Sequence, residues 1–284
     1  MRAPSAMAMG VCAGLVASLG TRLVGRRVGL RAGLVFALLP IVSRYGQEAR
    51  PYALAAMFAT LSSLLLLRLL ERPGQFARAA CYAAALTGLG LTHLLALLVL
   101  PAHLACCVRF TRDRPFLVID RRTFPRVALA AGVGVGFVLL LVFAGARQRS
   151  AQIGRGGSLP ELVGLASRSI SHATLGALVL GAIVVVLALR QAFASRQPIL
   201  LRLWAVLPPV VLLSTYPVLH LWAMRYVVFT LPAIVLLVAN AIEPLTARIR
   251  EPAWATAVTV ALVGVLGARM HVAARSSLAR SSGD

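Results

Sequence analysis

The chain has 284 residues, of which 60% are hydrophobic and 13% charged, with a mean hydropathy of +0.87. Soluble domains carry about 25% charged residues, so the composition excludes a soluble protein and predicts an all-α, polytopic transmembrane helical bundle. The net charge of +21 comes from 29 arginines, because the chain has no lysine. These arginines lie mostly in short gaps between apolar runs, as in loops held at anionic headgroups. We therefore expect a lipid bilayer as a partner and no nucleic acid.

Ten apolar runs follow one another along the chain, and we expect about ten membrane segments. They cover residues 4–21, 28–42, 52–70, 79–92, 94–108, 127–145, 172–189, 199–213, 226–241 and 253–270. Several runs hold only about 15 residues, fewer than the ~20 that a helix needs to span a bilayer. The runs on either side of residues 91–93 could also form one bent element. One bundle can accommodate the whole chain, so we expect residues 1–284 to form a single transmembrane domain.

The arginines alternate between successive gaps. Eighteen of them lie in the gaps 22–31, 68–78, 109–126, 190–202 and 243–252. The other eleven lie at the N-terminus, in 43–51, 146–171 and 214–225, and in the tail after residue 268, and the gap 92–94, which alternates with the same set, has none. Cytoplasmic loops carry the excess of arginine, so the first set is predicted to face the cytoplasm and the second set the outside.

Other motifs indicate packing rather than chemistry. The four cysteines lie in apolar runs, without a Cys-x-x-Cys pair or a histidine at zinc-ligand spacing, so we expect neither a metal site nor a disulfide. Gly10 and Gly14 favour close helix packing, as does the glycine-rich stretch 132–136. We expect His103 to lie deep in the bundle and to be structural.

One stretch of the predicted outer face, SRYGQEARPYAL at residues 43–54, contains Glu48, one of only eight acidic residues. Proline is favoured in the first turn of a helix, so Pro51 predicts a helix start. Glu48 would then lie near the positive end of that helix, where a carboxylate is stabilised and where Arg44 or Arg50 could pair with it. Glu48 is therefore either a helix-end acid or a functional carboxylate.

Two more polar clusters are predicted on the same face. His93 follows Thr92 at a run boundary, where it either caps a helix end or serves a site. Arg225 either snorkels to the interface or binds an anion, and it lies within an aromatic belt made by Tyr216, Trp222 and Tyr226. Arginine binds phosphate bidentately, so the three clusters together suit an anionic lipid headgroup.

Three segments resemble the membrane-embedded glycosyltransferases of the GT-C superfamily: RYGQEARPYALAAMFATLSSLLLLRLL, GLTHLLALLVLPAHL and MRYVVFTLPAIVLL. In particular they are similar to the bacterial glycosyltransferase family 39, or dolichyl-phosphate-mannose-protein mannosyltransferase-like, group. In that group a Gln-Glu-Ala-Arg-x-Tyr-Ala-Leu element opens a helix and a Thr-His pair ends the next. An Arg-Tyr pair with a following proline then begins a late helix. The resemblance covers most of residues 2–242.

The resemblance implies a GT-C-like bundle that transfers a sugar from a polyprenyl-phosphate-linked donor to a lipid, glycan or protein acceptor. The reaction would take place at the periplasmic or outer face of a bacterial inner membrane. No cofactor is certain from the resemblance, which leaves room for a divalent metal. The implied site residues are Glu48 and His93 for catalysis, Arg50 and Arg225 for the donor phosphate, and Gln47, Tyr52 and Tyr226 in support.

The chain departs from this family at one place. A carboxylate in the first outer loop normally acts as the base, and residue 1 falls where the second family helix begins. We therefore expect a domain truncated at its N-terminus relative to the family, and little activity from the chain as written. Two other functions stay open. A transporter or lipid flippase would predict paired repeats and mid-span charges, and a catalytically inactive relative would bind lipid or a partner.

The predicted topology can be tested with reporter fusions at Pro115 and Pro160. Because the arginine bias places 109–126 inside and 146–171 outside, the two fusions should report opposite sides of the membrane. Equal signals from the two fusions would contradict the topology.

Overall fold

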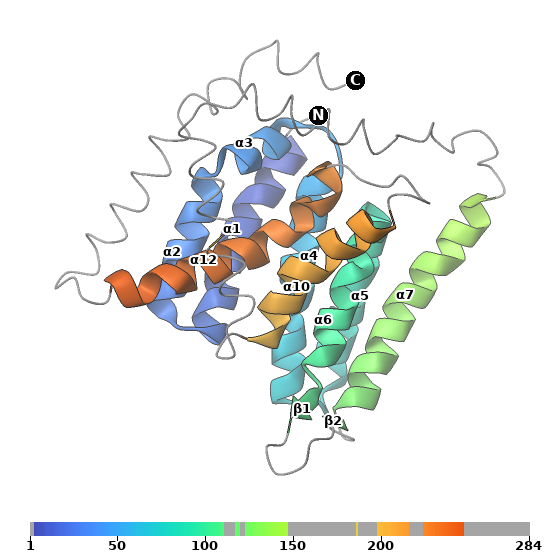
Figure 1. The fold of residues 1–284 in the computed structure, drawn as a ribbon. Coiled ribbons are helices and arrows are strands. Elements are labelled where there is room, and N and C mark those ends of the chain that lie inside the picture. Colours follow the sequence, from blue (N-terminus) through green and yellow to red (C-terminus); the bar gives the residue numbers. More distant parts are fainter. Residues whose placement is uncertain are drawn as a thin grey trace.

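A computed structural model describes residues 3–110, 117–119, 123–146, 186, 198–215 and 224–246 (Figure 1). Over these residues the chain is helical, apart from the antiparallel strands β1 (Val108–Phe110) and β2 (Leu117–Ile119). The longer helices are α1 (Ala3–Leu23), α4 (Tyr52–Glu71), α5 (Phe76–Thr92), α7 (Phe124–Ala146), α10 (Ile199–Ser214) and α12 (Leu231–Thr246). The shorter pieces are α2 (Arg26–Leu38), α3 (Pro40–Gln47), α6 (Leu100–Ala105) and the 3₁₀ helices η1 (Leu94–Val99) and η2 (Met224–Thr230).

Three helices in the described part of the chain are long and apolar enough to cross a membrane: Ala3–Leu23, Tyr52–Glu71 and Arg225–Glu243. A fourth span results if α2 and α3, which are bent by 58°, count as one. A polytopic helical membrane protein is thus confirmed at three to four candidate spans. The expectation of about ten segments stays a prediction, because two of the predicted runs lie outside the described residues. These are the run 253–270 and the run 172–189, of which only residue 186 is described.

The bend between α2 and α3 has a local cause. Leu39 adopts an extended conformation, with φ −64° and ψ 131°, directly before Pro40. A residue before proline is disfavoured from the helical region, whereas proline itself suits the first turn of the next helix. The run predicted over 28–42 is therefore divided in two, and helix continues to Gln47, into the segment that we expected to be a gap.

The break expected at residues 91–93 is confirmed. α5 ends at Thr92, and His93 is extended with φ −159°. Its N–H donates to the carbonyl of Leu89 over 2.8 Å, and its own carbonyl accepts the N–H of Ala96 over 2.9 Å. His93 thus ends one helix and begins the next without leaving its backbone polar groups unpaired.

Two glycines bring α1 and α2 into backbone contact. A Cβ on Gly20 would lie 2.7 Å from the Cα of Gly29. A Cβ on Gly29 would overlap the backbone nitrogen of Thr21 and lie 2.5 Å from the carbonyl oxygen of Ala17. Small residues permit this close approach between helices in a membrane.

The glycines that we expected to pack behave differently. A Cβ on Gly10 or Gly14 would meet nothing within 4 Å among the described residues. In the stretch 132–136, Gly134 lies close to α5, since its Cβ would be 2.8 Å from the carbonyl oxygen of Ala83. The expected packing role therefore holds for Gly134, whereas Gly10, Gly14, Gly132 and Gly136 contact no other described helix and their role stays a prediction.

An ion pair joins α2 to α12. Arg31 is only 1% exposed, and its Nη1 lies 2.9 Å from Oε2 of Glu243, 212 residues further along the chain. Arg31 belongs to the predicted cytoplasmic gap 22–31, and the structure buries it instead. Removing one partner of a buried ion pair costs about 3–5 kcal/mol, so this contact fixes the C-terminal part of α12 against α2.

A buried polar network joins three helices around His103. Ser63 donates to the carbonyl of Ala59 over 2.8 Å. Its oxygen therefore accepts the Nε2–H of His103 over 3.0 Å, and the Nδ1 of His103 accepts the Tyr82 hydroxyl over 2.9 Å. Ser63, Tyr82 and His103 are fully buried, so the expectation that His103 lies deep in the bundle is confirmed, and its contacts are consistent with the expected structural role.

The α1–α2 contact yields a prediction with a matched control. Gly29→Ala should destabilise the protein by about 1–3 kcal/mol, because an added methyl group in a tight contact forces backbone shifts. Gly10→Ala, on the open face of α1, should be neutral or slightly stabilising, because alanine is the better helix former. Thermal unfolding in one detergent would compare the two variants. Equal effects would contradict the close contact.

Candidate functional site

Five rings gather where three separated segments meet. Tyr52 begins α4, His93 follows α5, and Tyr226 lies in η2. The ring centroid of His93 lies 5.7 Å from those of Tyr52 and Tyr226, and 6.3 Å from that of Phe229. Tyr45 of α3 lies 5.6 Å from Tyr52, edge to face. Such distances are typical of stabilising aromatic pairs, and we call these five residues the ring cluster.

Local structure explains how each ring reaches the cluster. Tyr52 follows Pro51, which caps the start of α4, so the expected helix start is confirmed. Tyr226 and Phe229 are three residues apart in a 3₁₀ helix, where such side chains lie on the same face. Without knowledge of this 3₁₀ segment, Phe229 could not be assigned to the site from the sequence. Tyr45 was not predicted as a site residue because residues 43–51 were predicted to be a gap, whereas Tyr45 lies in α3.

Two arginines border the ring cluster. The guanidinium carbon of Arg225 lies 5.3 Å from the centroid of Tyr226, and that of Arg44 lies 6.0 Å from the centroid of Tyr45. Arginine over an aromatic face is attracted to the ring electrons. Arg225 also interacts electrostatically with the phenols of Tyr45 and Tyr52. The expected anion-binding arginine is thus held beside the rings rather than isolated at the interface.

Two buried nitrogens at the ring cluster lack a hydrogen-bond partner among the described residues: Nδ1 of His93 and Nε of Arg225. A buried polar group without a partner costs about 1–3 kcal/mol. Both residues contact the ring of Tyr226, so one polar ligand there could serve both. Burial lowers the pKa of His93 from its ordinary value of 6.5, so the imidazole is neutral at pH 7.

Glu48 lies between two helix ends. It is the C-cap of α3, and it precedes Pro51, the N-cap of α4, by three residues. Glu48 also interacts electrostatically with Tyr52, the first residue of α4. Its predicted position before the start of α4 therefore holds, and the end of α3 beside it was not predicted. The predicted pairing with Arg44 is present, with Nε and Oε1 3.4 Å apart. Exposed pairs at this spacing contribute only about 0.3–0.5 kcal/mol, so the pair holds the carboxylate weakly.

The other expected site residues lie on the same turn. Arg50 is exposed between α3 and α4 and interacts electrostatically with Tyr52. Gln47 is the half-buried last residue of α3. The structure thus brings Tyr52, His93, Tyr226 and Arg225 together, with Glu48 and Arg50 on the adjoining turn. Tyr216 and Trp222 lie outside the described residues.

The described residues do not offer a site for the divalent metal that the resemblance left open. Nowhere in the described part of the chain do three His, Cys, Asp or Glu side chains gather. Three acidic residues fall in that part, and two of them, Glu71 and Glu243, pair with arginines of α1 and α2. The chemistry available at the ring cluster is therefore that of guanidinium groups, a neutral imidazole, phenols and one carboxylate.

The chain is similar over residues 8–115 to the family described as Protein O-mannosyl-transferase TMEM260 N-terminal domain. The match begins within α1, ends beyond β1 and includes Glu48, Arg50, Tyr52 and His93. Arg225 and Tyr226 lie outside it, and it covers less than half of the chain. None of the curated proteins matches. The finer resemblance to glycosyltransferase family 39 stays a prediction, and residues 8–115 are shown to resemble the N-terminal region of a membrane protein O-mannosyltransferase.

Proposed function

We propose that this chain is a membrane glycosyltransferase that moves a sugar from a polyprenyl-phosphate-linked donor to an envelope acceptor. The observation that carries the proposal is the meeting of two parts of the chain. Tyr52 and His93, inside the region similar to the O-mannosyltransferase domain, contact Tyr226 beside Arg225, outside it. These residues come together only in the folded chain. Such a meeting of distant segments is expected of an active centre, whereas residues that only end a helix need no distant partner.

The ring cluster suits a lipid-linked sugar for three reasons. Aromatic faces can pack against the apolar face of a sugar ring, because the C–H groups on that face are weakly polar. Guanidinium groups bind phosphate through paired, charge-assisted hydrogen bonds. The cluster also lies at the ends of α4 and of the span Arg225–Glu243, where the phosphate of a polyprenyl chain buried in the bilayer would emerge.

The proposed reaction is a single displacement at the anomeric carbon. The acceptor hydroxyl oxygen forms a bond to this carbon, while the bond from the carbon to the donor phosphate oxygen breaks. The bonding electrons leave with the polyprenyl phosphate, whose added negative charge Arg50 and Arg225 stabilise. Glu48 accepts the proton of the acceptor hydroxyl, and neutral His93 hydrogen-bonds a sugar hydroxyl.

The acceptor and the location are also proposals. A lipid, a glycan or a protein would serve as the acceptor. The name of the similar family, Protein O-mannosyl-transferase, favours mannose as the sugar and a protein hydroxyl as the acceptor. We place the reaction at the outer face of a bacterial inner membrane, on the basis of the arginine bias.

Arg225 is tested by donor binding. Arg225→Gln should weaken binding of a polyprenyl-phosphate sugar by about 10- to 100-fold, because a hydrogen bond to a charged group is worth ~1.5–3 kcal/mol. Arg225→Lys should restore only part of this, since an ammonium group lacks the planar fork. Arg126→Gln, an exposed arginine of α7, is the matched control and should bind as the parent does. Unchanged binding in Arg225→Gln would overturn this assignment.

Glu48 is tested by turnover per folded molecule. If Glu48 is the base, Glu48→Gln should lower turnover by 10²–10⁴-fold and leave donor binding nearly unchanged. If it only pairs with Arg44, the variant should lose a few tenths of a kcal/mol in stability and keep its turnover. Glu161→Gln, in the predicted outer loop, is the parallel variant. A loss of turnover in this variant and not in Glu48→Gln would identify Glu161 as the base. Donor binding without turnover in the parent would indicate an inactive, lipid-binding relative.

A further inference from the structure

Arginines concentrate at the end of the bundle opposite the ring cluster. The chain turns twice there, between α1 and α2 and between α4 and α5. We call this region the arginine end, and its six basic residues are Arg22, Arg26, Arg27, Arg68, Arg72 and Arg78. The same two segments, 22–27 and 68–78, contain one acidic residue, Glu71.

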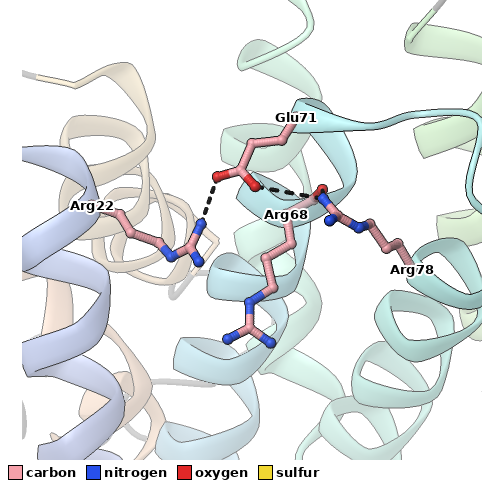
Figure 2. A network of polar contacts seen from close by, with 4 residues as sticks. All are labelled: Arg22, Arg68, Glu71 and Arg78. Carbon is pink, nitrogen blue, oxygen red and sulfur yellow. Dashed lines mark hydrogen bonds and ion pairs between the residues drawn. The ribbon is translucent and has the colours of Figure 1, made fainter.

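Glu71 organises two of these arginines. Its Oε1 lies 2.5 Å from Nη1 of Arg22 at the end of α1, and its Oε2 lies 3.5 Å from Nη1 of Arg78 in α5. Arg78 also donates to the carbonyl of Arg68. Figure 2 shows Glu71 between Arg22 and Arg78, with the guanidinium of Arg68 apart from the carboxylate. One carboxylate thus links the ends of α1, α4 and α5 and sets the spacing of the guanidinium groups around it.

This arrangement leaves a surplus of positive charge. Six arginines face one carboxylate, and Arg26, Arg27, Arg68 and Arg72 are exposed, with no acidic partner among the described residues. Like charges at one end of the bundle repel one another, and a bound anion lowers this repulsion. The arginine end is therefore a favourable place for an anion.

The position of the arginine end indicates which anion. α4 is a candidate span that ends at Glu71, so the arginines lie at the depth of lipid headgroups. Apolar side chains are exposed beside them: Phe76, at 86%, begins α5, and Leu30, at 50%, lies in α2. A soluble anion would gain nothing from these apolar groups, whereas a lipid presents a phosphate and an acyl chain together.

We propose that the arginine end is a binding site for the headgroup of an anionic phospholipid. The guanidinium groups of Arg68 and Arg72 bind the phosphate, while Arg22 and Arg78 are held in place by Glu71 at its border. Phe76, which begins α5 directly after the turn that contains Arg72, contacts the acyl chains. This site lies at the opposite end of α4 from the ring cluster, and it does not depend on the proposed glycosyl transfer.

The test measures lipid binding to the purified chain. Thermal unfolding in a neutral detergent would be followed with added phosphatidylglycerol, phosphatidylcholine or inorganic phosphate. Phosphatidylglycerol should raise the melting temperature with a saturable dependence, because one arginine near an anionic surface is worth ~1 kcal/mol. Phosphatidylcholine and inorganic phosphate should have little effect. Arg68→Gln should weaken the phosphatidylglycerol effect about fivefold in half-saturating concentration.

Arg126→Gln is the matched control, since Arg126 is exposed in the first turn of α7, at the same end of the bundle but outside the segments 22–27 and 68–78 (Figure 1). It should leave the half-saturating concentration unchanged. An equal loss in both variants would show a diffuse charge effect and overturn the site. An equal stabilisation by phosphatidylcholine, or by inorganic phosphate alone, would overturn the lipid assignment. If Arg68→Gln fails to fold, Arg72→Gln provides the same comparison.

Discussion

A helix in a bilayer must satisfy its own backbone hydrogen bonds, because lipid tails offer no partners. This constraint limits where the chain can break. The break at His93 is closed on both sides, by Leu89 and by Ala96, and the break before Pro40 falls where proline has no N–H to leave unpaired. The irregular backbone at His93 then provides the geometry that brings its ring against those of Tyr52 and Tyr226.

The same constraint separates the polar chemistry into two ends joined by one helix. α4 begins with Tyr52 in the ring cluster and ends with Glu71 among the arginines. Its 20 residues span about 30 Å at 1.5 Å per residue, the thickness of the hydrocarbon core. Between the ends, the Ser63–His103–Tyr82 network and the Arg31–Glu243 pair connect helices through buried polar contacts. The scaffold thus holds the ring cluster and the arginine end at opposite ends of α4.

Sequence reasoning located several helices to within a few residues. The predicted runs 4–21 and 52–70 correspond to α1 and α4, because burial in lipid depends on local hydrophobicity alone. Sequence reasoning was wrong where polar or charged residues lie inside a helix, because such residues also mark a gap between helices. The helix through Gln47 was not predicted because its last turns are polar, so the position of Glu48 as the C-cap of α3 was not predicted either. Arg31 was assigned to a loop because the sequence shows its charge but not that it pairs with the distant Glu243.

The sequence by itself determined that this protein is an apolar, arginine-rich helical membrane protein, and it named most of the residues at the ring cluster. Periodicity and charge are local properties, so they can be read along the chain. Only the tertiary structure decided which residues meet. Tyr52, His93 and Tyr226 are separated by dozens of residues, and Arg31 and Glu243 by 212. Their contacts depend on helix bends, on the close approach of glycines and on buried ion pairs, which result from the packing of all the helices together.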